Sequence, residues 1–334
     1  MNRPSGSDPL LSVEGLTTVF DVKPRPVVAV NDVSFEIRKG ETLGLVGESG
    51  SGKSVTAFSI IGLLQPPGRV AAGRVLFQGR DLAKLPEPEM RKVRGAGIGF
   101  VFQEPMAALN PVMRVGAHIA EALIVHGMAS KTEARDKAIA LLRAVKITDP
   151  EKRVDDYPHQ LSGGMRQRVM MAVALACKPP LLIADEPTTA LDVTVQAQVL
   201  ELLRDMKKQF DLSLLLITHD LGVIAETADR VAVMYAGRIV EQGTVREIFH
   251  QPKHPYTRGL LASIPGGAAG SRLQAIDGTV PNLAALPTGC SFAPRCSDRM
   301  DLCTTAFPPR RGSPSGLPGS GEHSVRCYLH GGRP

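Results

Sequence analysis

The chain has 334 residues, enough for one large α/β domain and an appended segment. Its net charge of +6 is modest, aromatic residues make up 4% and Trp is absent, so a nucleic-acid groove with stacking platforms is not indicated. No apolar run approaches the roughly 18 residues that span a bilayer, and the polar N-terminus lacks the apolar core of a signal peptide. We therefore expect a soluble, cytoplasmic protein; a membrane partner would have to supply any spanning helices.

The first half of the chain begins with strand patterns and ends with helical ones. Mixed apolar and polar positions in residues 10–40 predict antiparallel strands. Residues 41–46 predict a short strand that leads into a glycine-rich loop, and residues 55–64 predict the helix after it. Residues 98–102 predict another short strand, which ends before Gln103. Helical periodicity then dominates, so we expect a helical subdomain at about 105–175.

The second half returns to alternating helices and strands. We expect helices at 163–177 and 194–209, strands at 181–185 and 213–218, and a hairpin around Gly237. Strands that alternate with helices indicate a parallel sheet covered on both faces. The predicted class is therefore α/β, with a nucleotide-binding domain over 10–263. From residue 264, Gly, Pro and Ser become dense, and we place a C-terminal extension at 264–334.

The glycine-rich loop at residues 47–54 reads Gly-Glu-Ser-Gly-Ser-Gly-Lys-Ser, a complete phosphate-binding loop (P-loop). Its backbone amides must wrap phosphates closely, and Gly47, Gly50 and Gly52 leave room for that approach. Lys53 places a cation on the outer phosphates, and the hydroxyl of Ser54 suits Mg²⁺. A plain Gly-rich turn is the alternative, but the strand before the loop and the helix after it favour phosphate binding.

Two acidic residues stand at the end of the expected strand at 181–185. Asp185 ends this strand and is placed as a second anchor for Mg²⁺. Glu186 is placed to polarise an attacking water. The alternative is that these acids only cap a helix in solvent. The P-loop in the same chain favours a role in Mg²⁺ binding and catalysis instead.

A second anion-binding pattern lies at Ser162, Gly163 and Gly164, between Leu161 and Met165 and directly before a helix. Its amides and the positive end of the helix dipole can hold an anion. The P-loop already provides for a phosphate in this chain, so we expect this second pattern to face the nucleotide of a partner subunit.

Six motifs occur in the order found in ATPase subunits of ABC transporters, which the chain resembles over about residues 10–250. They are the P-loop, Gln103, the 161–164 segment, Asp185 with Glu186, the 190–192 segment and the 218–220 segment. The resemblance implies binding of ATP and Mg²⁺, with Ser49 and Ser51 among the loop contacts. It implies that Gln103 senses the γ-phosphate and Mg²⁺ and couples to a membrane partner, and that Glu186 and His219 act in hydrolysis. Ser162, Gly163 and Gly164 would contact the γ-phosphate on the opposite subunit, and Asp192 would lie at that interface. Phe20 would stack on adenine, although a lone Phe in a strand is usually core. Met165 departs from the commoner Gln of the pattern.

Several segments narrow the resemblance to the oligopeptide and dipeptide importer branch, among them residues 102–106, 157–159, 254–257 and 289–296. This implies an ATPase that energises peptide import at the cytoplasmic face of the membrane, as a peripheral subunit. The implied partners are two transmembrane permease subunits, a second related ATPase, with a heterodimer favoured over a homodimer, and an extracytoplasmic substrate-binding protein; no nucleic acid is expected. Nickel, glutathione or another small solute is the alternative cargo. Three functions outside this branch stay open: a soluble non-transport ABC ATPase, an iron–sulfur redox-sensing ATPase and an export ATPase.

The extension holds Cys290, Cys296, Cys303 and Cys327, spaced C-x5-C-x6-C-x23-C. Four thiolates can ligate a [4Fe–4S] cluster or zinc, although zinc sites favour tighter pairs. Disulfides suit an oxidising compartment, which the absent signal peptide argues against. Unligated thiols are disfavoured because the extension shows no other core. We expect a [4Fe–4S] cluster, with zinc as the alternative. His323 or His330 could stand in for a ligand, although loop histidines are normally solvated. The remaining cysteine, Cys177, is expected in the core.

Overall fold

The computed structural model describes residues 8–189, 191–264, 276–312 and 323–331, and divides into two compact units. The first unit contains Met1–Arg38, Thr42–Lys84 and Thr218–Pro334, and the second contains Lys39–Glu41 and Leu85–Ile217. In the described part of the chain, no helix is both long and apolar enough to cross a bilayer.

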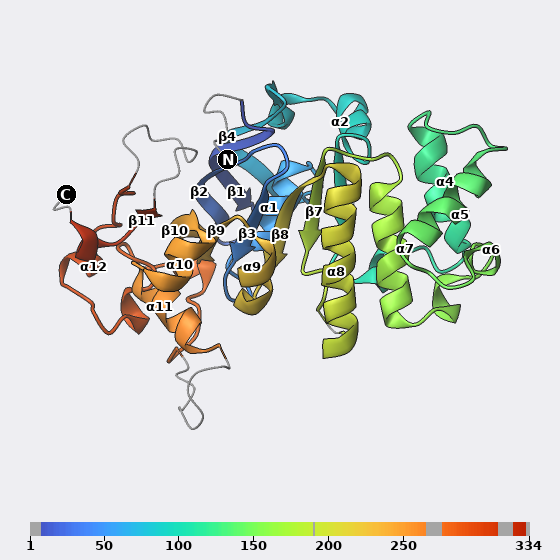
Figure 1. The fold of residues 1–334 in the computed structure, drawn as a ribbon. Coiled ribbons are helices and arrows are strands. Elements are labelled where there is room, and N and C mark those ends of the chain that lie inside the picture. The colour runs from blue at the N-terminus through green and yellow to red at the C-terminus, as the bar shows by residue number, and fades with distance from the viewer. Residues whose placement is uncertain (1–7, 190, 265–275, 313–322, 332–334) are drawn as a thin grey trace. The chain divides into compact units, whose positions relative to one another are not determined.

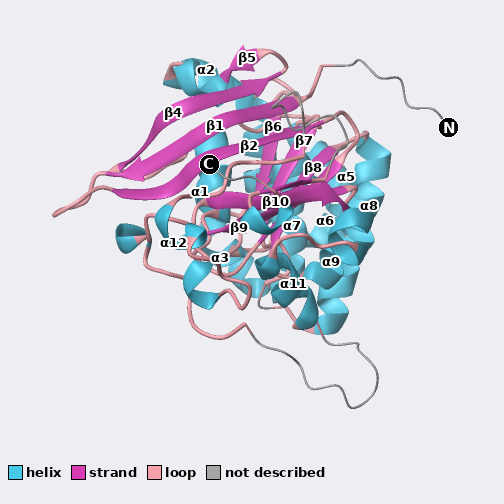
Figure 2. Ribbon diagram, turned by 90° about the vertical axis from the view of Figure 1, so that its left-hand side faces the viewer, coloured by secondary structure: helices cyan, strands magenta, loops and turns pink. Residues whose placement is uncertain are grey.

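The first unit contains an antiparallel sheet in the order β2-β1-β4-β5 (Figure 2). Its strands are β1 (Leu11–Phe20), β2 (Val27–Ile37), β4 (Gly68–Phe77) and β5 (Arg80–Asp81). Val13 pairs with Phe35 on one side and with Val75 on the other, and all three are buried. The antiparallel strands expected in residues 10–40 are therefore confirmed, whereas β4 was not foreseen because its middle is exposed and lacks apolar alternation.

The P-loop in the first unit lies between β3 (Thr42–Val46) and α1 (Lys53–Ile60). β3 pairs in parallel with β9 (Arg230–Tyr235), which forms the expected hairpin with β10 (Arg238–Thr244). β11 (Ser324–Val325), from the distal part of the chain, adds to β10. The other helices of this unit are α9 (Leu221–Thr227), α10 (Val245–His250), α11 (Pro255–Ala262) and α12 (Leu302–Thr305).

The second unit contains parallel strands and a group of helices. β6 (Ile98–Val101), β7 (Leu181–Asp185) and β8 (Ser213–Thr218) are parallel neighbours, and the last residue of β8 belongs to the first unit. Figure 1 shows α4, α5 and α7 lying together in this unit, as the helical periodicity predicted. Its helices are α2 (Glu87–Val93), α3 (Pro105–Ala108), α4 (Val115–Val125), α5 (Ala134–Ala144), α6 (Pro150–Arg153), α7 (Gly163–Leu175) and α8 (Val193–Phe210).

Short 3₁₀ turns occur at Leu82–Lys84, Pro158–Gln160, Leu283–Ala285, Ala293–Arg295 and Tyr328–His330.

The C-terminal extension has apolar packing, part of it against the preceding domain, contrary to the expectation that only a bound group would organise it. Phe292 packs edge-on against Tyr235, with ring centroids 5.3 Å apart at 88°, and lies 5.4 Å from the ring of Tyr256. Ala293, Cys303 and Tyr328 form a small buried cluster beside it. The sequence did not indicate this core, because its aromatic residues are far apart in the chain.

Candidate functional site

The P-loop adopts a backbone path that requires glycine at defined positions. Gly52 has φ of +100°, a conformation that L side chains rarely adopt. At Gly47, a Cβ atom would come within 2.1 Å of the carbonyl oxygen of Met234. The close contact at Gly47 and the positive φ at Gly52 therefore disfavour any larger residue at these two positions of the loop.

Lys53 extends back along the loop that precedes it. Its Nζ donates to the carbonyl oxygens of Gly47 at 2.8 Å and Glu48 at 3.1 Å, and the residue is only 4% exposed. The ammonium group is thus held against the backbone of the loop, and its contact with phosphates stays a prediction. Ser54 follows in the first turn of α1 and is half-buried. The loop therefore fits a polyphosphate.

Glu186 directly follows β7 in the second unit, where other side chains orient its carboxylate. Asp185 ends β7 and is 2% exposed. Glu186 has φ of +45°, and its Oε2 accepts hydrogen bonds from Gln103 Nε2 at 3.2 Å and Thr189 Oγ1 at 2.8 Å. A left-handed conformation at a non-glycine residue is strained, and such strain clusters at functional sites. The structure thus brings Gln103 and Glu186 together, and Thr189 is a contact that the sequence did not indicate.

The second anion-binding pattern lies at the start of α7. Ser162 caps this helix, because its Oγ accepts from the N–H of Met165 at 3.3 Å, and Ser162 and Gly163 are exposed. Asp192 caps α8 in the same way, accepting from the N–H of Val195 at 2.9 Å. A Cβ at Gly164 would come within 2.7 Å of Val195 Cγ1, so the starts of the two helices pack closely.

Two further predicted contacts lie in the first unit. His219 directly follows β8 and is exposed, and its neighbour Asp220 caps α9 by accepting from the N–H of Gly222 at 2.8 Å. Phe20 ends β1 and is half-buried, and its ring lies so close to Gly68 that a Cβ there would come within 2.7 Å. The roles of these two residues toward a nucleotide stay predictions.

The sequence did not indicate the contacts that reach the P-loop from the C-terminal part of the chain. The N–H of Glu48 donates to Tyr256 Oη at 2.9 Å, and Arg295 donates to both carboxylate oxygens of Glu48. No local pattern could have indicated a pair separated by 247 positions.

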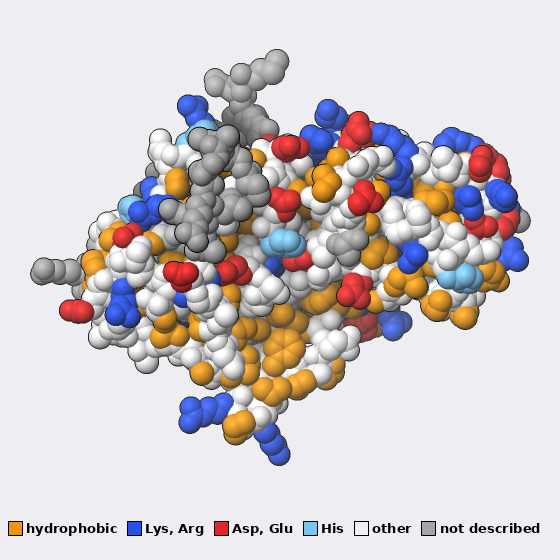
Figure 3. Space-filling model, turned by 90° about the horizontal axis from the view of Figure 1, so that it is seen from below, with side chains coloured by type: hydrophobic (Ala, Val, Ile, Leu, Met, Phe, Trp, Pro, Cys, Tyr) orange, Lys and Arg blue, Asp and Glu red, His pale blue; other side chains and the backbone are white. Residues whose placement is uncertain are grey.

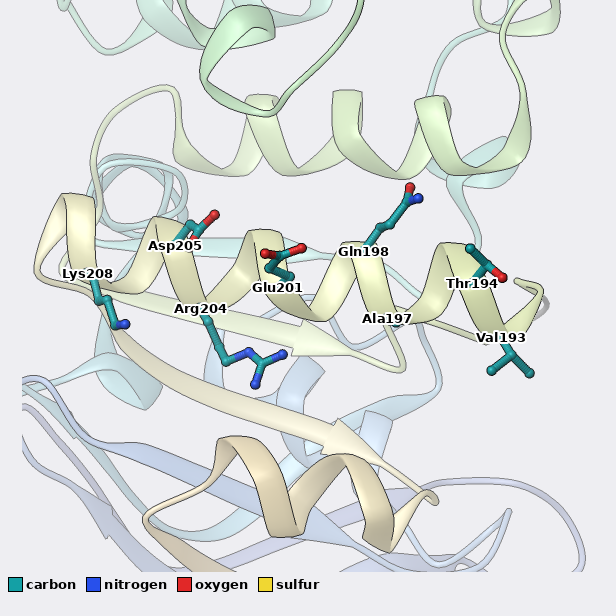
Figure 4. A pocket seen from close by; sticks show the side chains of 8 residues that line it. All are labelled: Val193, Thr194, Ala197, Gln198, Glu201, Arg204, Asp205 and Lys208. Carbon is teal, nitrogen blue, oxygen red and sulfur yellow. The ribbon is translucent and has the colours of Figure 1, made fainter.

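Two of the surface hollows in the second unit are lined by residues next in sequence to predicted nucleotide contacts. One follows α8 and is lined by Glu201, Arg204, Asp205 and Lys208 among others; Figure 4 shows these side chains spread along the helix rather than converging. The other is lined largely by apolar groups from β6, α4 and α7, including Phe100, Ala122, Val125, Met170 and Val173. Phe102, which also lines this hollow, directly precedes Gln103 in the sequence.

The face of the molecule seen from below is mixed in character. Figure 3 shows hydrophobic side chains on it among Lys, Arg, Asp and Glu.

The four cysteines of the extension all line one small, largely enclosed cavity together with His254 and Tyr328. None of them forms a disulfide, and burial raises the pKa of the Cys290 thiol to about 11. Among the residues that the structure describes, no group of three or more His, Cys, Asp or Glu side chains has the arrangement of a metal site. The donor chemistry therefore fits a metal cluster, but the thiols are not at ligating positions. Cys177 is separate and buried, with Sγ 3.6 Å from the carbonyl oxygen of Ala122.

Two family models match the chain. Residues 30–189 match a family described as ABC transporter, and residues 240–303 match one described as oligopeptide/dipeptide transporter, C-terminal region. The second match includes Cys290, Cys296 and Cys303, and Cys327 lies beyond it.

Curated relatives are similar over nearly their whole length. The dipeptide transport ATP-binding protein DppD of Bacillus subtilis (strain 168) is 52% identical over 322 residues, covering 96% of this chain and 94% of the relative. The oligopeptide transport ATP-binding protein OppD of Escherichia coli (strain K12) is 51% identical over 312 residues, covering 93% and 92%. Among solved structures, the ATP-binding cassette MJ0796, a dimer bound to ADP and phosphate, has a TM-score of 0.64 at 28% identity and covers 71% of this chain and 99% of its own.

Proposed function

The chain belongs to the ABC transporter family, and on that premise we propose that it is the ATP-hydrolysing subunit of an importer of oligopeptides or dipeptides. The observation that carries the proposal is the combination of a complete P-loop with a C-terminal region of the oligopeptide/dipeptide transporter type in one chain. The near-full-length similarity to peptide transport ATP-binding proteins supports the same cargo class. Nickel, glutathione or another small solute remains the alternative, because this subunit need not touch the cargo.

In this proposal, ATP is bound between two ATPase subunits. Lys53 and the loop amides would hold the phosphates, Ser54 and Asp185 would hold Mg²⁺, and Gln103 would sense the γ-phosphate and Mg²⁺. Glu186 accepts a proton from the attacking water, and His219 contacts the γ-phosphate. Ser162 and Gly163 are exposed at the start of α7, which leaves them accessible to the nucleotide of another subunit. Asp192, at the start of α8, would lie at the same interface.

Closing of the dimer on ATP would move the membrane subunits, since a ligand shifts an equilibrium by binding one state more tightly. We propose two transmembrane permease subunits, a second related ATPase rather than an identical one, and an extracytoplasmic substrate-binding protein as partners. The apolar hollow between β6, α4 and α7 supports a docking place for a permease segment, and Val125 at its rim is 73% exposed. The chain would act as a peripheral subunit at the cytoplasmic face.

The test is reconstitution of the chain with its permease subunits and binding protein in proteoliposomes. We expect ATP-dependent uptake of a labelled dipeptide or oligopeptide, and loss of uptake with Lys53→Ala. Uptake of nickel or glutathione in place of peptides would support the alternative cargo. ATP hydrolysis without any association with membrane subunits would favour a non-transport ATPase.

We also propose that Cys290, Cys296, Cys303 and Cys327 hold a [4Fe–4S] cluster, with zinc as the alternative. Their convergence on one enclosed cavity supports this, although loading would require the thiols to move closer together. The thiols would lose their protons on binding. Anaerobic purification should yield brown protein with stoichiometric iron and sulfide, whereas colourless protein with stoichiometric zinc would support the alternative.

A further inference from the structure

Glu48, the second residue of the P-loop, is held from three directions. Its N–H donates to Tyr256 Oη at 2.9 Å, and its carbonyl oxygen accepts from Lys53 Nζ at 3.1 Å. Its carboxylate accepts from Arg295 Nη1 at 2.7 Å and Nη2 at 3.0 Å. Tyr256 and Arg295 both belong to the region that matches the oligopeptide/dipeptide transporter family. This C-terminal region therefore forms hydrogen bonds with the loop that is proposed to bind phosphate.

The guanidinium of Arg295 is fully engaged in this position. Nε donates to the carbonyl oxygen of Asp277 at 2.9 Å, Nη2 also donates to that of Ile276 at 3.2 Å, and Nη1 lies 3.4 Å from Tyr235 Oη. With the bonds to Glu48, these contacts account for all the N–H donors of an arginine. The side chain is 5% exposed, against 30% for Glu48. An arginine that is buried and bound in this way has a fixed geometry, which a lysine could not reproduce.

Glu48 carries a negative charge on a loop whose function is to bind an anion. A free carboxylate there would repel a polyphosphate, and the repulsion would be stronger than in bulk water because the loop is partly buried. The bidentate pair with Arg295 both cancels this charge and fixes the first turn of the loop.

We propose that Arg295 is a positioning residue for ATP binding, which neutralises Glu48 and holds the P-loop in its phosphate-binding form. The inference rests on the proposed function, that this loop binds ATP. It adds that the C-terminal region is needed at the nucleotide site itself. Since Arg295 lies between Cys290 and Cys296, the same short segment faces both the cysteine cavity and the P-loop.

A purely structural role, in which Arg295 only anchors the C-terminal region, makes a different prediction. In that case, removal of the Glu48 charge would not repair an Arg295 variant. If Arg295 acts by neutralising Glu48, the substitution Glu48→Gln should restore binding, because it removes the charge that Arg295 would otherwise balance.

The test measures the dissociation constant for MgATP by calorimetry, on the full chain and on Arg295→Ala, Glu48→Gln and the double variant. We expect Arg295→Ala to raise the dissociation constant about tenfold, equivalent to about 1.4 kcal/mol, and the double variant to return to within about threefold of the wild type. The defect of the single variant should shrink in high salt, which screens the exposed carboxylate. Arg258→Ala is the matched control, because Arg258 lies in the same region in an exposed ion pair with Asp298 and should bind ATP as the wild type does.

Melting of the nucleotide-free variants separates folding from binding. Should Arg295→Ala fail to fold, Arg295→Lys replaces it, and we expect an intermediate dissociation constant because the charge is kept and the bidentate geometry is lost. Wild-type affinity in the folded Arg295 variant, or a double variant as weak as the single one, would overturn the proposal. Failure of the wild-type chain to bind MgATP would instead overturn the proposed function on which it rests.

Discussion

Gln103 donates a hydrogen bond from its Nε2 to Oε2 of Glu186 across 3.2 Å, and the same oxygen accepts from Thr189 Oγ1 at 2.8 Å. Gln103 follows the end of β6 after Phe102, and Glu186 directly follows β7, so neighbouring parallel strands bring the two side chains together. The carboxylate is thus oriented before any substrate arrives. A change at Gln103 would be felt at the group proposed to activate water.

The substitution Glu186→Gln should abolish steady-state hydrolysis while leaving ATP binding intact. An amide keeps the size of the side chain but cannot take a proton from water, and loss of such a base typically costs about 10²–10⁴-fold in rate. ATP would then remain bound, and gel filtration in MgATP should show a stable dimer with the partner ATPase. Glu201→Gln is the control, because Glu201 is exposed on α8 beyond the first turn, which Asp192 caps. Hydrolysis by Glu186→Gln at the wild-type rate would remove the catalytic role.

Gly163 and Gly164 should respond differently to alanine, although they are neighbours. A Cβ at Gly164 would meet Val195 Cγ1 at 2.7 Å, whereas the nearest atom to a Cβ at Gly163 is Leu191 Cδ2 at 3.8 Å. Overpacking costs about 1–3 kcal/mol, so Gly164→Ala should lower the free energy of unfolding by about that amount. Gly163→Ala should fold normally and weaken only ATP-dependent dimerisation, if this surface meets the nucleotide of a partner. Equal stability losses in urea titrations would contradict the packing seen at these positions.

The strands and helices that flank the P-loop and the acidic pair could be predicted because each carries its own local pattern. β7 is a short buried apolar run that ends at Asp185, and Ser162 and Asp192 stand where helix caps are expected. The ion pair between Arg295 and Glu48 could not be predicted, because it depends on tertiary packing between segments far apart in the chain. For the same reason the sequence did not reveal the packing of Phe292 against Tyr235, and the extension was wrongly expected to lack a core.

Substitution of the extension cysteines should separate cluster ligands from ordinary thiols. We expect Cys303→Ser to lower the iron content of anaerobically purified protein sharply, because Cys303 is buried at the cavity that the other three also line. Cys177→Ser is the matched control, since Cys177 is also a buried free thiol but lies in the second unit. Iron and zinc should be measured together in each variant. Equal metal content in both variants, or none in the wild type, would contradict a four-cysteine site.

The C-terminal region should lose stability as the pH falls from about 6.5 to about 4, because burial lowers the pKa of His254 from 6.5 to about 4. His254 caps α11 with a ring nitrogen, Nδ1, that accepts from the N–H of Tyr256 at 3.0 Å, so the folded state needs the neutral imidazole. The unfolded chain binds the proton more readily, so the contribution of His254 is complete above pH 6.5 and is lost as the pH approaches 4, up to about 3 kcal/mol. Glu241 acts in the same direction at lower pH: burial raises the pKa of its carboxylate, but hydrogen bonds from His323 and others together outweigh burial and hold it below the usual value. Urea unfolding between pH 7 and pH 4 should show this slope, and His254→Asn, which can still cap the helix but does not titrate, should flatten it. His250→Gln is the control, because His250 is exposed and its substitution should leave the slope unchanged; an unchanged slope in His254→Asn would assign the acid sensitivity to other groups.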